Sequence, residues 1–266
     1  MNGDLEVALE AARRGVEVIK SFQDEEVNIR YKGRNDLVTD ADVATQEAVI
    51  SVLKSRLPDD QILAEESGLG EGEIRQGRVW IIDPIDGTTN FAYNFPLFCV
   101  SVGLCEDGQP IVGVVIEVNL GEEFTAVKGE GAWLNGKRIR VSDINESSRA
   151  LIGTGFPYND RTLVDEYMAF FRSLMDEVQG IRRPGAATYD LCCVAAGRFQ
   201  GFYEYALQAW DVAAAALIIQ EAGGLVTDWN GGDNWLFGER IVAGNPAIHT
   251  FLLDKIREMI PEEHLA

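Results

Sequence analysis

The chain has 266 residues, and its 43 aspartates and glutamates against 23 lysines and arginines give a formal charge of −20. This balance argues against a protein that binds nucleic acid through its phosphates or adheres to an anionic membrane, because both would need a basic face. Hydrophobic residues make up 46% of the chain, too much for a disordered acidic segment. We therefore expect a folded protein with a sizeable core and with neither a nucleic-acid nor a membrane partner.

Two residue types narrow the chemistry further. Only two histidines occur, His249 and His264, which argues against a Ser-His-Asp or Cys-His site and against a His-rich zinc site. The four cysteines lie in apolar stretches without C-x-x-C spacing, as expected of buried free thiols in a reducing compartment.

The N-terminal residues show no secretory signal pattern, and the longest apolar run, residues 212–219, is too short to span a bilayer. The sequence thus predicts a cytoplasmic protein.

In the first half of the chain, two amphipathic helices precede a series of strands. The helices are predicted over residues 5–22 and 42–57, and the second ends before Pro58. Short buried strands are expected at residues 61–64 and 79–82. A β-meander follows, with Asn135-Gly136 as a two-residue hairpin turn. Its strands are predicted at residues 99–105, 111–118, 123–128, 132–134 and 138–141.

In the second half, strands and helices alternate. The strands are predicted at residues 151–154, 180–182, 201–205, 225–228 and 241–243, and the helices at residues 163–179, 186–196, 211–222 and 246–260. The change of character at residues 143–148 divides the chain into an α+β lobe, residues 1–146, and an α/β lobe, residues 147–266. The predicted fold class is therefore α/β (α+β) with two lobes.

The most informative feature is the position of certain acids. Glu65 and Glu66 follow one buried strand, Asp83 and Asp86 follow another, and Asp211 precedes an apolar helix. Acids gathered at the ends of core strands repel one another and have raised pKa values unless a cation compensates them. With few histidines and no thiolate spacing, carboxylate oxygens point to Mg²⁺, and shared acids suit two ions.

The residues after Asp86 can bind an anion. Gly87 permits close approach of the backbone, and Thr88 and Asn90 are residue types that begin helices. Free amides at the start of a helix bind phosphate. Residues 81–91 therefore offer metal ligands and a phosphate cradle together, which suits hydrolysis of a phosphate ester by metal-activated water.

At this point the chain resembles a known family. Residues 80–91, WIIDPIDGTTNF, resemble the first signature of the inositol monophosphatase family, and residues 210–224, WDVAAAALIIQEAGG, resemble its second. Further matching segments, in the family's order, are LVTDAD at 37–42, EES at 65–67 and GAWLNG at 131–136. The resemblance implies a layered αβαβα sandwich, a Mg²⁺-dependent and lithium-sensitive phosphatase activity, and a homodimer.

The resemblance also assigns the metal and catalytic residues. Glu65, Asp83, the Ile85 carbonyl and the Thr88 hydroxyl would hold the first Mg²⁺, and the second would be held by Asp83, Asp86 and Asp211. Glu65 and Thr88 would orient the attacking water. Asp42 would support this water through Thr88 or hold a weaker third Mg²⁺.

The substrate contacts follow in the same way. The amides of Gly87 and Thr88 would hold the phosphate. The segment Gly185-Ala186-Ala187 would contact the substrate, and Glu204 would accept hydrogen bonds from polyol hydroxyls.

Several charged residues keep two interpretations. Glu66 is either a metal ligand or, as we favour, a neighbour of the site, since adjacent strand residues point to opposite sides. Lys32 and Arg34 lie in a loop that the family uses as a flap over the metals, or they are solvated loop charges. Arg182 and Arg183 either steer phosphate or form ion pairs at a dimer interface, which we favour.

The sequence as a whole favours a phosphatase for a small polyol or sugar phosphate, with inositol 1-phosphate as the first candidate substrate. Fructose 1,6-bisphosphate is the second, because some members of the family handle both. An alternative of another class is a binding or regulatory protein on the same fold, because some members have partners in the transcription apparatus. The intact oxygen donors at every ligand position argue for the enzyme.

Overall fold

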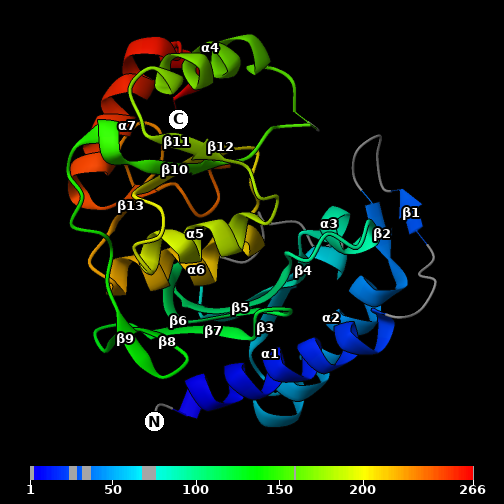
Figure 1. The fold of residues 1–266 in the computed structure, drawn as a ribbon. Coiled ribbons are helices and arrows are strands. Elements are labelled where there is room, and N and C mark those ends of the chain that lie inside the picture. The colour runs from blue at the N-terminus through cyan, green and yellow to red at the C-terminus, as the bar shows by residue number, and fades with distance from the viewer. Residues whose placement is uncertain (1–2, 24–28, 32–36, 68–75, 159, 266) are drawn as a thin grey trace.

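Five layers build the computed structural model, in the order helix, sheet, helix, sheet, helix (Figure 1). The structure describes residues 3–23, 29–31, 37–67, 76–158 and 160–265. Each sheet is formed by its own stretch of chain, the seven-stranded sheet by residues 61–139 and the five-stranded sheet by residues 151–244. This arrangement confirms the predicted αβαβα sandwich of mixed α/β class.

The seven-stranded sheet has the strand order β3-β4-β5-β6-β7-β8-β9. Its strands are β3 (Gln61–Ala64), β4 (Arg78–Asp86), β5 (Cys99–Glu106), β6 (Gln109–Glu117), β7 (Glu122–Val127), β8 (Gly131–Leu134) and β9 (Lys137–Ile139). β3 and β4 are parallel, and every later pair is antiparallel, as short connections require. β4 is buried along nearly its whole length, because helices cover both faces of the sheet.

The five-stranded sheet has the order β11-β10-β12-β14-β13. Its strands are β10 (Leu151–Thr154), β11 (Gly180–Arg182), β12 (Gly201–Tyr205), β13 (Leu225–Thr227) and β14 (Arg240–Gly244). β10 pairs in parallel with β11 and β12, whereas β14 is antiparallel to both of its neighbours. The parallel pairs need crossover connections, and α4 and α5 occupy them.

The helices form the other three layers (Figure 1). The outer pair on the seven-stranded sheet is α1 (Gly3–Phe22) and α2 (Asp40–Arg56), the middle pair is α5 (Ala187–Ala195) and α6 (Ala209–Glu221), and the outer pair on the five-stranded sheet is α4 (Val164–Met175) and α7 (Pro246–Met259). The short elements are β1 (Ile29–Tyr31), β2 (Leu37–Thr39), η1 (Glu65–Ser67), α3 (Thr88–Ala92), η3 (Ser147–Arg149) and η4 (Glu262–His264). The buried side chains of α5 and α6 pack in one hydrophobic cluster with residues of both sheets.

Small residues allow α6 to lie directly on the seven-stranded sheet. A methyl group built on Gly113 would lie 2.5 Å from the carbonyl oxygen of Ala214, and one on Gly103 would lie 3.2 Å from the Ala214 nitrogen. Glycine in β5 and β6 thus makes room for the helix backbone. This close contact fixes the N-terminal turn of α6, and with it Asp211, beside β4.

Two elements differ from the predicted bounds next to the candidate site. α2 begins at Asp40 and not at residue 42, because Thr39 is the residue that caps it: the Thr39 amide and hydroxyl donate to Asp42 Oδ2 at 2.7 and 2.5 Å. β4 continues to Asp86 and does not end at residue 82, because its ladder with β5 resumes at Asp86 after an irregularity. The two acids of this strand are therefore held by sheet hydrogen bonds.

Of the remaining predictions from the sequence, some are confirmed and others are wrong. The β1–β2 hairpin was not expected, and α4 ends at Met175, four residues early. All four cysteines are buried and free, as predicted. Among the described helices, none has the length and apolar character needed to cross a membrane. Lys32 and Arg34 lie outside the described residues.

Candidate active site

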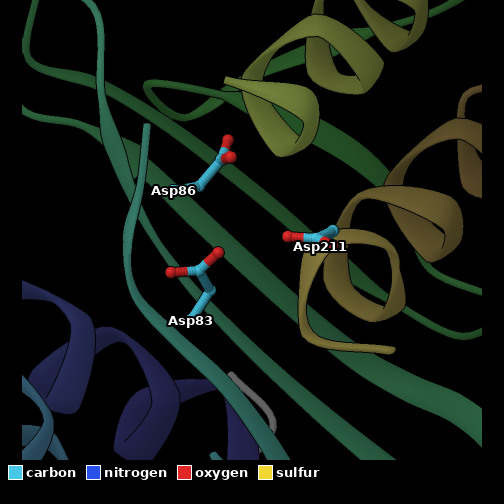
Figure 2. A group of neighbouring side chains, drawn as sticks. All are labelled: Asp83, Asp86 and Asp211. Atoms are coloured by element: carbon cyan, nitrogen blue, oxygen red, sulfur yellow. The ribbon is translucent and has the colours of Figure 1, made fainter. Parts of the chain in front are cut away.

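Three aspartates from two elements meet where the seven-stranded sheet faces α6. Asp83 and Asp86 lie near the end of β4, and Asp211 lies in the first turn of α6. One carboxylate oxygen from each lies within 4.8 Å of those of the other two. Figure 2 shows the three side chains directed toward a shared space between the strand and the helix. The structure thus brings the two acids that the sequence placed after one buried strand together with the acid that it placed before an apolar helix.

Burial and mutual repulsion make this cluster electrostatically unfavourable on its own. Asp83 is 2% and Asp86 is 6% exposed. Burial, and then the charge of Glu65, raises the pKa of Asp83 well above its usual value, and burial raises the pKa of Asp86 to about 6. The pKa of Asp211 is also raised well above its usual value, first by burial and then by Asp86. A divalent cation among these oxygens would remove both penalties, so the donor set fits Mg²⁺.

Asp86 also joins the sheet to the middle helix layer. Its carboxylate accepts hydrogen bonds from the backbone amides of Ala187 (3.0 Å) and Thr188 (2.9 Å) at the N-terminus of α5. The Cys99 thiol lies 3.4 Å from Asp86 Oδ2 and donates to it. The positive end of the helix favours the charged carboxylate and fixes its orientation. Ala187 is predicted to contact the substrate. In the structure its backbone amide donates a hydrogen bond to Asp86.

Asp42 and Thr88 form a second polar unit beside the cluster. The Thr88 hydroxyl lies 3.0 Å from Asp42 Oδ1 and 3.0 Å from the Ile85 carbonyl oxygen, so its single proton can be donated to one of them at a time. Asp42 is fully buried, and burial raises its pKa despite the hydrogen bonds from Thr39 and Thr88. The predicted link from Asp42 to the site through Thr88 is present.

Glu65 lies near enough to the cluster for its charge to act on two of the aspartates. It begins η1 and is half-buried, and its charge raises the pKa of both Asp83 and Asp211. The next amide, that of Glu66, donates to Gln46 Oε1 of α2 at 2.8 Å, which anchors the turn. Because η1 is a 3-10 turn, the strand alternation that we expected to separate Glu65 from Glu66 does not apply. The ligand role of Glu65 stays a prediction.

The predicted phosphate cradle has the backbone geometry that glycine provides. Gly87 precedes α3 with a φ of 94°, in the left-handed region. A methyl group there would lie 3.1 Å from the carbonyl oxygen of Leu97. The turn that carries the amides of Gly87 and Thr88 therefore requires glycine.

A cavity of about 160 Å³ adjoins the acidic cluster. Asp86 and Asp211 of the cluster line it, and so does Glu204 of β12. The predicted contact residues Gly185, Ala186 and Ala187 line it too. Glu204 is 8% exposed, and burial raises its pKa to about 8 although the nearby positive charge of Arg183 lowers it. The cavity joins the predicted metal and substrate residues in one space.

One residue of this cavity escaped the sequence reasoning. Asp190 of α5 lines it, is 2% exposed, and has no hydrogen-bond partner for Oδ1 within the described part of the chain. Burial and then the charges of Asp86 and Glu204 raise its pKa well above the usual value. A lone acid inside the apolar helical stretch ATYDLCCVA was the signal that could have revealed it.

Comparison with known proteins identifies the class of this fold and site. A model described as "Inositol monophosphatase family" matches residues 3–260. The chain therefore belongs to the inositol monophosphatase family, as its motifs indicated. It has the phosphomonoesterase fold of that family, together with an acidic cluster of the kind that binds metal.

Individual relatives match almost end to end. The chain is 41% identical to a protein named Nus factor SuhB from Pasteurella multocida over 265 residues, 99% of each chain. The structure of extragenic suppressor protein suhB from Bartonella henselae superposes with a TM-score of 0.92 at 37% identity, covering 97% of this chain and 100% of that one. Inositol monophosphatase from an Anabaena (Nostoc) species gives a TM-score of 0.86 at 38% identity, covering 97% of both chains.

Proposed function

We propose that this chain is a Mg²⁺-dependent phosphomonoesterase for a small polyol or sugar phosphate, with inositol 1-phosphate as its first substrate. The observation that carries the proposal is the continuity of the acidic cluster with the cavity that contains Glu204. A phosphate bound among the metals would place its ester oxygen, and the polyol attached to it, toward that cavity. A solved relative from Anabaena (Nostoc) is itself named inositol monophosphatase.

The oxygen donors divide into two overlapping sets. Glu65, Asp83, the Ile85 carbonyl and the Thr88 hydroxyl would hold one Mg²⁺, and Asp83, Asp86 and Asp211 the other. When bound, these ions would activate water, neutralise the phosphate and stabilise the departing alkoxide. Asp42 can support a weaker third ion or act only through Thr88.

The chain's own residues position and deprotonate the attacking water. Asp42 Oδ1 accepts a hydrogen bond from the Thr88 hydroxyl at 3.0 Å, so that Thr88 can pass its own proton to Asp42 as its oxygen takes one from the attacking water. Glu65 carries the second acceptor for that water. On the other side, the Gly87 and Thr88 amides hold phosphate oxygens, and Glu204 accepts hydrogen bonds from substrate hydroxyls. Water therefore attacks phosphorus directly, without a covalent intermediate on the protein.

Phosphate release from inositol 1-phosphate, measured with Mg²⁺ and with a chelator, tests this function. We expect turnover only with Mg²⁺, and a loss of several orders of magnitude in Asp83→Asn with the fold intact. Asp254→Asn, which removes an exposed acid on α7, is the matched control and should retain full activity. Wild-type turnover in Asp83→Asn would refute the assignment.

Fructose 1,6-bisphosphate is the second candidate substrate, because the cavity also contains the basic side chain of Arg183. A panel of inositol, sugar and nucleotide phosphates ranks the candidates by kcat/KM. The highest value for fructose 1,6-bisphosphate would replace inositol 1-phosphate in the proposal.

A regulatory role is the candidate of another class. The observation that favours it is the name Nus factor, given to relatives that are 41% and 43% identical to this chain. An absence of turnover across the substrate panel would favour this role. Binding of RNA or of transcription proteins to the purified chain would then test it, together with the expectation that the chain has no nucleic-acid partner.

We also propose a cytoplasmic homodimer. The family resemblance and two large exposed side chains after α3, Tyr93 and Phe95, support self-association. Sedimentation of the purified chain should give twice the mass of 29.3 kDa. A monomer at micromolar concentration would contradict this proposal without affecting the catalytic one.

A further inference from the structure

One buried glutamine of α2 joins that helix to the turn that carries Glu65. Gln46 is 7% exposed, and both ends of its side-chain amide are hydrogen-bonded to η1. Its Oε1 atom accepts from the Glu66 amide at 2.8 Å, and its Nε2 atom donates to the hydroxyl oxygen of Ser67 at 3.2 Å. This side chain therefore binds two successive residues of the turn, and Glu65 directly precedes them.

The place of η1 in the fold makes such an anchor important. The turn follows β3, which lies at the edge of the seven-stranded sheet among the described strands and pairs there with β4. None of the three residues of η1, all of which the structure describes, is buried. A short turn at the edge of a sheet, without a buried side chain, depends on polar contacts for a fixed position.

The type of residue at position 46 is itself informative. Val49, three residues further along, belongs to the same buried face of α2, and an apolar side chain at position 46 would avoid the cost of burying an amide. Asp42 lies one turn before Gln46 and accepts the hydrogen bond from Thr88. These two buried polar residues thus connect α2 to both segments that supply the predicted water-binding side chains, those of Thr88 and Glu65.

We propose that Gln46 is a positioning residue for the metal site: by holding η1 on α2, it fixes the backbone that carries the Glu65 carboxylate. This inference rests on the proposed function, in which Glu65 is a ligand of the first Mg²⁺. A ligand whose backbone is already in place loses less conformational freedom when the ion binds. Gln46 therefore raises the affinity for Mg²⁺ without contacting the ion, as hydrogen-bond partners behind metal ligands do.

The rise in melting temperature with Mg²⁺ concentration gives the dissociation constant of the ion and needs no substrate. It is measured for wild type, Gln46→Met, Glu65→Gln and the double variant that combines them. Gln46→Met keeps the length of the side chain and removes both hydrogen bonds to η1. Val49→Ala is the matched control, because it removes buried methyl groups from the side of α2 that faces Gly15 of α1.

For Gln46→Met we expect the dissociation constant for Mg²⁺ to rise about 10-fold, the lower end of the effect of such partners. Val49→Ala should lower the melting temperature of the metal-free protein and change the dissociation constant less than about 2-fold. In the Glu65→Gln background, Gln46→Met should add less than about 2-fold, because the carboxylate whose position it fixes is absent.

Two results would overturn the positioning role. One is a dissociation constant that Gln46→Met leaves unchanged while the melting temperature falls, which would make Gln46 a core residue only. The other is an equal loss of affinity in the Glu65→Gln background, which would mean that Gln46 does not act through Glu65. If Gln46→Met does not fold, Ser67→Ala, at an exposed position, removes one of the two hydrogen bonds and decides the question. It should raise the dissociation constant about 3-fold, and an unchanged value would refute the role.

Failure of the phosphatase function gives a different result. A protein that binds Mg²⁺ more weakly in Gln46→Met, but releases no phosphate from any ester of the substrate panel, keeps the positioning role and loses the proposed function. A protein that binds no Mg²⁺ at all loses both.

Discussion

The buried carboxyl group of Glu204 should make the metal-free protein less stable at alkaline pH than at acidic pH. Burial raises its pKa from the usual 4.5 to about 8, so the folded chain holds this proton more tightly than the unfolded chain does. The contribution to stability is therefore intact below pH 4.5 and is lost as the pH rises from about 4.5 to about 8. Replacing Glu204 by glutamine keeps the shape of the side chain but removes the charge.

The size of this effect on the free energy of unfolding follows from the rise in the pKa of Glu204. At 1.36 kcal/mol for each pKa unit, the rise to about 8 corresponds to at most about 5 kcal/mol at pH 8, and water entering the cavity lowers that figure. For a chain of this size, such a difference corresponds to a melting temperature higher by roughly 10 °C in Glu204→Gln. At pH 4, where both side chains are neutral, the two proteins should melt within about 2 °C of each other.

Thermal unfolding of both proteins in chelator, at intervals from pH 4 to pH 9, measures this difference. Glu258→Gln, at an exposed position of α7, is the matched control and should follow the wild type at every pH. The acids of the metal cluster have raised pKa values in every variant, so only the difference between proteins is informative. Parallel curves for Glu204→Gln and wild type would refute the argument that this carboxyl group is destabilised by burial.

Three further predictions concern the site and the surface. Thr88→Val should reduce turnover about 100-fold because Asp42 Oδ1 loses its donor, and Thr88→Ser should restore most of it, as measured by phosphate release. Gly155→Ala should raise KM for inositol 1-phosphate more than it lowers kcat. The new methyl group would lie 1.7 Å from Glu204 Oε1, so the Glu204 side chain must move. An unchanged KM would contradict this prediction. Added KCl should raise the melting temperature of the metal-free protein by screening its charge of −20, and a value indifferent to salt would count against a repulsive acidic surface.

The sequence predicted most helices and strands because their patterns are local, whereas the layered sandwich followed from the family resemblance. The buried strands 61–64 and 99–105 and the helix at 246–260 are runs whose periodicity and flanking residues decide their type. The acids of the site could be found for a related reason, since Asp83, Asp86 and Asp211 are charged residues inside otherwise apolar sequence. Their meeting in space followed from the family resemblance, and the structure confirms it.

The full length of β4, the hydrogen bond between Cys99 and Asp86, and the position of Asp190 could not be predicted, because each depends on tertiary contacts. β4 continues through Asp83 and Pro84, residue types that usually end a strand, to Asp86, and only pairing with β5 keeps the segment in the sheet. The donation from Cys99 to Asp86 joins residues from neighbouring strands. Asp190 looked like an ordinary first-turn helix acid until the structure placed it against the cavity.

The same buried acids connect the stability of this protein to its function. An acidic chain repels an anionic substrate at long range, but two Mg²⁺ ions would bring +4 to a cluster whose three aspartates carry at most −3, and would reverse the local sign. Glu204 in the cavity wall behaves differently, because burial raises the pKa of its carboxyl group to about 8 and so keeps it largely protonated at neutral pH. Under the proposed function, the site is then positive where the phosphate would bind, and Glu204 would meet the polyol as a neutral hydrogen-bonding group.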